Sequence, residues 1–147
     1  MKQIIYKFSS LLLFVILSSG SANAQSSLDS LHQPIIKFFD GLSFINEGLI
    51  RENTTSDFIL LEAGMLWNND TLINRIRPLQ NTDFERKNSF NFLISEQNKD
   101  MAWVSYWNQA NIKRNGQSFV YKWLESVILI RQAGQWKIRM MHSTPLR

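Results

Sequence analysis

The 147-residue chain contains no cysteine, only two histidines, and few glycines and prolines, six and three respectively. The absence of cysteine excludes disulfides, thiolate chemistry, cysteine metal sites and a lipid-modified cysteine. The two histidines, His32 and His142, form neither a His-x-His nor a helical His-x-x-x-His spacing, so the sequence predicts no metal site. It also lacks a glycine-rich phosphate loop and a nucleophile elbow, and we therefore expect no bound cofactor.

No apolar run reaches the roughly 20 residues that a membrane-spanning helix needs. The longest run, residues 11–17, follows Lys2 and Lys7 and precedes an A-x-A cleavage site that ends at Ala24. This pattern is typical of a secretory signal peptide. We therefore predict that residues 1–24 form a signal peptide and that the mature protein is soluble, either periplasmic or secreted.

The remaining segment, residues 25–147, has the length of a single domain with one hydrophobic core and contains no linker-like stretch. Cleavage removes two lysines, which leaves 14 basic against 12 acidic residues and lowers the net charge from +4 to +2. So small an excess of positive charge argues against a nucleic-acid partner. Once the signal peptide is cleaved, we expect no association with membranes.

Hydrophobic periodicity predicts an α+β layout. Apolar residues over residues 28–49 recur at helical spacing, which indicates a long amphipathic helix that begins near His32, with Pro34 in its first turn. A small hairpin is expected over residues 58–67, then a short helix that Pro78 terminates. Four long antiparallel strands follow, so we expect helices on one face of a strongly curved sheet.

Two turn signals predict how the last three strands pair. The Asn-Gly pair at residues 115–116 suits a two-residue type I′ turn, which places Tyr106 opposite Glu125. A two- or four-residue loop around the Ala-Gly pair at residues 133–134 places Glu125 opposite His142. A three-residue loop there would shift the register by one residue and remove His142 from the row.

One face of this predicted sheet carries the only candidate chemistry. A Glu–His pair can act as a general base and a tyrosine hydroxyl can donate to an enolate-like oxygen, so Glu125, His142 and Tyr106 are candidate catalytic residues. Alternatively, the three side chains only satisfy one another's hydrogen bonds in a buried row. The candidate ligand-binding residues on this face are Tyr106, Asn108, Trp123, Glu125, Met140 and His142.

The opposite face carries the apolar side chains of Trp103, Trp107, Ile128 and Ile130. A large exposed apolar patch usually marks an interface, which favours a homodimer formed sheet to sheet. The alternative is a small satellite core beneath a loop.

Several segments resemble the NTF2-like superfamily, particularly the exported SnoaL-like proteins grouped as DUF4440. They are the long first helix, the stretch at residues 58–67, the Asp-Met-Ala-Trp-Val at 100–104 and the Gly-Gln-Trp-Lys-Ile-Arg-Met-Met-His-Ser-Thr at 134–144. The resemblance implies a cone in which a curved antiparallel sheet wraps around a long N-terminal helix and shorter helices, often in a homodimer. Members include isomerases, dehydratases and polyketide cyclases as well as binding and assembly modules, so the fold alone does not determine function.

Three functions are compatible with these observations. The leading hypothesis is an exported domain that binds a small, partly apolar ligand in its cone. The first alternative is a lyase or isomerase that uses Glu125 with His142 as base and Tyr106 as donor. The second is a structural homodimerisation module whose cone is filled by large side chains.

Overall fold

The structure, a computed structural model, describes residues 20–146, so most of the predicted signal peptide lies outside the described residues. The elements in chain order are α1 (Gly20–Ser43), α2 (Glu47–Glu52), β1 (Thr54–Glu62), β2 (Met65–Trp67), α3 (Asn69–Ile76), the 3-10 helix η1 (Arg77–Leu79), β3 (Glu85–Asn98), β4 (Met101–Arg114), β5 (Gln117–Gln132) and β6 (Gln135–Pro145). Within this described part, no helix combines the length and apolar character needed to cross a membrane.

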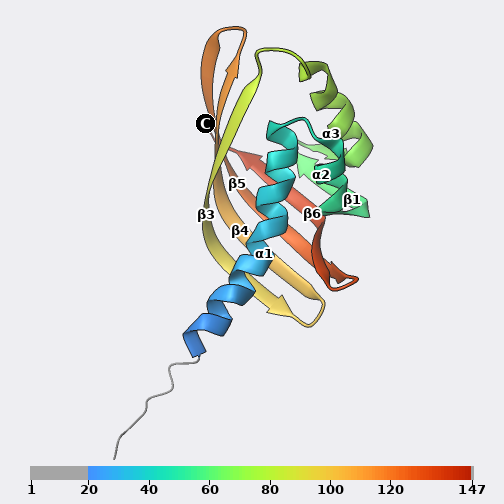
Figure 1. Cartoon of the computed structure of the whole chain (residues 1–147), viewed down its shortest axis with the longest axis vertical. Helices are drawn as coiled ribbons and strands as arrows, with labels where there is room; N and C mark the ends of the chain where they lie inside the picture. Colours follow the sequence, from blue (N-terminus) through green and yellow to red (C-terminus); the bar gives the residue numbers. More distant parts are fainter. Residues whose placement is uncertain (1–19, 147) are drawn as a thin grey trace, which may run out of the picture.

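The six strands form one curved, mixed sheet in the order β2-β1-β6-β5-β4-β3. Strands β3 to β6 form an antiparallel meander, whereas β1 pairs with β6 in parallel. Helix α1 crosses the concave face of the sheet, and α2 and α3 lie beside it over β1 (Figure 1). The expected α+β layout with four long antiparallel strands is thus confirmed.

The turn between β4 and β5 has the predicted geometry. Asn115 and Gly116 both adopt positive φ, 52° and 70°, as a type I′ turn requires. The predicted pairing of Tyr106 with Glu125 is confirmed along the whole ladder. The backbone N–H of Gly116 also donates to the Asp83 carboxylate at 2.8 Å, which ties the tip of this hairpin to the segment before β3.

The predicted register between β5 and β6 is correct near the turn and wrong beyond it. Leu129 pairs with Ile138 as a two-residue loop requires, but an irregularity follows, so that Arg139 is the extra residue of a β-bulge. Arg139 donates to the backbone carbonyl of Asp57 on β1 at 2.6 Å and pairs with its carboxylate at 3.1 Å. From the bulge onward every β6 side chain has changed face, and Glu125 lies opposite Ser143.

The first helix also differs from its prediction. It begins at Gly20 in the described part of the chain, so Pro34 lies inside it rather than in its first turn. It ends at Ser43 because Ile45 adopts positive φ (52°) and the side chain of Asn46 caps α2 by accepting from Leu49 N at 3.0 Å. The apolar periodicity does not reveal this break, because Ile50 of α2 packs against the same core.

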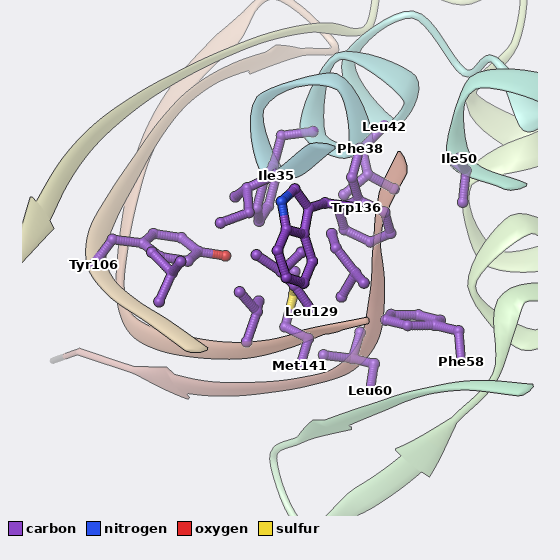
Figure 2. Close-up of a cluster of buried hydrophobic side chains, with 14 of the residues drawn as sticks. Ile35, Phe38, Leu42, Ile50, Phe58, Leu60, Tyr106, Leu129, Trp136 and Met141 are labelled. Carbon is purple, nitrogen blue, oxygen red and sulfur yellow. The ribbon is translucent and has the colours of Figure 1, made fainter. Parts of the chain in front are cut away.

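The core lies between α1 and the concave face of the sheet. Figure 2 shows α1 side chains meeting those of the strands around Trp136. The completely or almost completely buried side chains include Leu31, Ile35, Phe38, Phe58, Tyr106, Val127, Leu129, Ile138 and Met141. These side chains fill the space between α1 and the middle of the sheet.

Candidate ligand-binding site

Glu125 lies at the centre of a polar network on the concave face. Ser143 Oγ donates to Glu125 Oε1 at 2.8 Å, and Asn108 Nδ2 donates to Oε2 at 3.0 Å. Asn88 Nδ2 donates to Asn108 Oδ1 at 2.7 Å, and Arg86 Nε donates to Asn88 Oδ1 at 2.8 Å. These five side chains, from β3, β4, β5 and β6, form the polar network.

Glu125 is only 4% exposed, and this burial controls its protonation. Desolvation disfavours the carboxylate and raises the pKa of Glu125 to about 7. Hydrogen bonds from Ser143 and Asn108 and the charge of Arg86 act in the opposite direction without cancelling this effect. Glu125 is therefore poised to exchange a proton near neutral pH.

Tyr106 lies beside Glu125, as the predicted pairing requires, and is fully buried. Burial and the neighbouring carboxylate raise the pKa of Tyr106 well above its usual range. Its hydroxyl points toward Trp136 in Figure 2 and has no hydrogen-bond partner among the described residues. The charge of Glu125 and a hydrogen-bond interaction with it both raise the pKa of Tyr106, although the two groups do not reach the geometry of a formed hydrogen bond.

The bulge at Arg139 removes two predicted residues from this face. His142 pairs with Ser126, is exposed, and lies on the convex face of the sheet. Met140 pairs with Ile128 and lies half-buried on that same face. The predicted placement of both on the concave face is wrong, and Ser143 occupies the position expected for His142.

Arg86 is the cationic member of the network, and its guanidinium lies near two aromatic rings. Its guanidinium carbon is 5.5 Å from the centroid of Phe39 and 5.8 Å from that of Trp123. Burial lowers the pKa of Arg86, whereas the carboxylates of Glu125 and Glu62 raise it.

A pocket of about 530 Å³ opens above the network, between the end of α1, η1 and the far ends of β3, β4 and β5. We name it the mouth pocket; its lining consists of Leu42, Ile76, Leu79, Phe84, Arg86, Ile112, Arg114, Asn115, Gln117, Phe119, Tyr121 and Trp123. In Figure 1 the β4–β5 hairpin rises at this end beyond the rest of the sheet. Of the predicted ligand-binding residues, Trp123 is in this lining, whereas Tyr106, Asn108 and Glu125 are buried beneath it.

Sequence reasoning missed three members of the network: Arg86, Asn88 and Ser143. A sequence signal for the first two exists. Spacing by two residues places Arg86 and Asn88 on the same face of a strand as Phe84, Phe90 and Phe92. No local signal marks Ser143, since its inward orientation depends on the bulge.

Comparison with known proteins identifies the fold. No protein-family model and no curated protein matches the chain. Solved structures do match it, among them a ketosteroid isomerase-like protein from Erwinia carotovora atroseptica (15% identity, 82% of this chain and 97% of that one, TM-score 0.68). An NTF2-like protein from Cytophaga hutchinsonii matches with 12% identity, 80% and 97% coverage and a TM-score of 0.66.

The chain has an NTF2-like fold. A type 2 hexachlorocyclohexane dehydrochlorinase shares it as well, with 14% identity, 86% and 93% coverage and a TM-score of 0.64. The expected cone, with a curved sheet around a long N-terminal helix, is confirmed for this NTF2-like domain. Because identities this low show the fold alone, its function must be inferred from the residues of the site.

Proposed function

We propose that this NTF2-like domain binds a small, mainly apolar molecule in the mouth pocket. The observation that supports the proposal is the pocket itself: its volume of about 530 Å³ falls within the range of about 300–1,000 Å³ that small-molecule sites occupy. Its walls are aromatic and aliphatic, with a few polar groups that can orient a ligand.

Fluorescence of the apolar dye N-phenyl-1-naphthylamine tests this proposal, since the dye becomes brighter when it leaves water. We expect the wild-type protein to enhance its fluorescence saturably. Ile112→Trp adds bulk to the pocket wall and should weaken binding, whereas Val120→Trp introduces the same side chain at an exposed position of the neighbouring strand. Equal dye binding by both variants would contradict the proposal.

A second candidate is proton-transfer chemistry at Glu125, favoured by a pKa of about 7, which suits a general base at neutral pH. His142 does not take part in this version because it lies on the convex face. The geometry favours binding over catalysis, since Ser143 and Asn108 already occupy both carboxylate oxygens in a buried site. Turnover of a β,γ-unsaturated ketosteroid that is lost in Glu125→Gln would favour the enzyme.

We also propose that the domain forms a homodimer through the convex face of its sheet. Trp103 and Trp107 are 42% and 40% exposed there, and Ile128 and Ile130 are half-buried beside them. Covering such apolar area with a second copy removes it from water.

Finally, we propose that the protein is exported and cleaved after Ala24. This cleavage would remove the first residues of α1 and leave the part that packs against the sheet intact. N-terminal sequencing of natively purified protein tests it, and a mature chain that retains Lys2 would contradict it.

A further inference from the structure

The mouth pocket is cationic as well as apolar. Its lining contains two charged side chains, Arg86 and Arg114, and no acidic one. Arg114 is exposed at the rim, whereas Arg86 is a half-buried residue of β3 in the pocket wall. Because burying an unpaired charge is costly, the partners of Arg86 determine what the pocket can accept.

The terminal nitrogens of Arg86 lack partners within the described part of the chain. Its Nε donates to Asn88, but neither Nη1 nor Nη2 takes part in a hydrogen bond or ion pair with the side chains described from residue 28 to residue 146. The Phe39 and Trp123 rings lie 5.5 and 5.8 Å away, near the outer limit of about 6 Å for a cation–π interaction. The guanidinium of Arg86, a residue of the pocket lining, thus retains donors without partners in the described chain.

The nearest carboxylates do not fully balance this charge. Glu125 and Glu62 both act on Arg86 electrostatically, yet neither lies within ion-pair distance of it. Burial raises the pKa of Glu125 to about 7, so the negative charge that Glu125 places near Arg86 is reduced at neutral pH. An anion in the pocket would supply the missing charge.

We propose that the mouth pocket selects aromatic or aliphatic molecules that carry a carboxylate, which the two terminal nitrogens of Arg86 bind side by side. The planar guanidinium matches a carboxylate in this way, and such charge-assisted pairs are stronger than neutral hydrogen bonds. The aromatic residues of the lining then hold the apolar body of the ligand. This inference rests on the proposed function, because it names the class of ligand for the same pocket.

Displacement of N-phenyl-1-naphthylamine by two molecules of nearly equal shape tests the inference. One is 2-naphthoate, which is anionic, and the other is 2-naphthamide, which is neutral. A hydrogen-bonded charge pair contributes about 1.5–3 kcal/mol, so naphthoate should displace the dye from wild-type protein at a concentration at least about tenfold lower. This wild-type comparison does not depend on the folding of any variant.

Arg86→Met should abolish the preference for naphthoate while naphthamide still displaces the dye. The matched control, Lys87→Met, removes the same charge from the next residue of β3, whose exposed side chain is on the other face. Equal displacement by the two competitors in wild-type protein, or a preference that survives in folded Arg86→Met, would overturn the inference. Failure of the proposed function gives a different result. Dye binding would then be insensitive to Ile112→Trp, and both proposals would be rejected.

Discussion

Replacing Glu125 by Gln should abolish a pH dependence that the buried carboxylate imposes on the stability of the fold. The substitution keeps the shape of the side chain and both of its hydrogen-bond partners. Asn108 can donate to the new amide oxygen, and the new amide nitrogen can donate to Ser143 Oγ, so each of these buried polar atoms keeps a hydrogen-bond partner. Only the charge is lost.

The expected magnitude follows from the pKa of Glu125, about 7 in the folded protein against 4.5 when exposed. Because the folded pKa is raised, the folded state holds the proton more tightly, and its contribution to stability is fully present below pH 4.5. That contribution is lost as the pH rises to about 7. At 1.36 kcal/mol per pKa unit, the carboxylate of Glu125 costs about 3 kcal/mol above that range.

Urea unfolding, followed by tryptophan fluorescence at pH values from 5 to 8, measures this effect. We expect wild type and Glu125→Gln to be similar in free energy of unfolding near pH 5, and the variant to become more stable by up to about 3 kcal/mol at pH 8. Glu96→Gln removes an exposed carboxylate from β3 and controls for the change in net charge. A difference between wild type and Glu125→Gln that stays constant from pH 5 to 8 would refute the reasoning.

Two further predictions concern the dimer and the helix junction. Trp107→Glu should convert the dimer to a monomer, as measured by light scattering. The control Asn74→Glu, at an exposed site on α3, should leave the dimer intact. A dimer that persists in Trp107→Glu would reject the convex face as the dimer interface. Gly41→Ala should lower the free energy of unfolding by about 1–3 kcal/mol, because a Cβ there would lie 2.7 Å from Cγ1 of buried Ile50. Gly48→Ala, at an exposed position of α2, should not lower the free energy of unfolding in this way. Equal urea midpoints for Gly41→Ala and Gly48→Ala would contradict this account.

Local signals predicted the elements whose geometry is determined locally. The Asn-Gly turn at residues 115–116 requires positive φ at both positions, so it defined the β4–β5 register and placed Tyr106 beside Glu125. Asn68 caps α3 by accepting from Thr71 N at 2.9 Å, which is also a local interaction. These features need no knowledge of the rest of the fold.

Other features depend on residues distant in sequence and were not predictable from local patterns. The bulge at Arg139 is anchored on Asp57, 82 positions earlier, and it exchanges His142 for Ser143 in the site. The parallel pairing of β1 with β6 is equally long-range. The pairing of the candidate residues was therefore predicted correctly between β4 and β5 and incorrectly between β5 and β6, where a tertiary contact determines the register.

Tyr106→Phe separates a structural from a chemical role for the tyrosine. The Tyr106 hydroxyl is buried without a hydrogen-bond partner in the described chain, and such a group costs about 1–3 kcal/mol of desolvation. We therefore expect Tyr106→Phe to unfold in urea at the same or a higher concentration than wild type. Tyr121→Phe, at an exposed position on β5, is the control.

A loss of more than about 1 kcal/mol in Tyr106→Phe alone would contradict this expectation, because a hydrogen bond to a charged group contributes about that much or more. The hydroxyl would then donate to the carboxylate of Glu125, and its removal would raise the pH at which Glu125 titrates. Such a result would strengthen the case for chemistry at Glu125, since a tyrosine that stabilises its anion could also stabilise an anion that forms on a substrate. Unchanged stability would instead favour a network that holds Arg86 in place, and ligand binding as the function of the site.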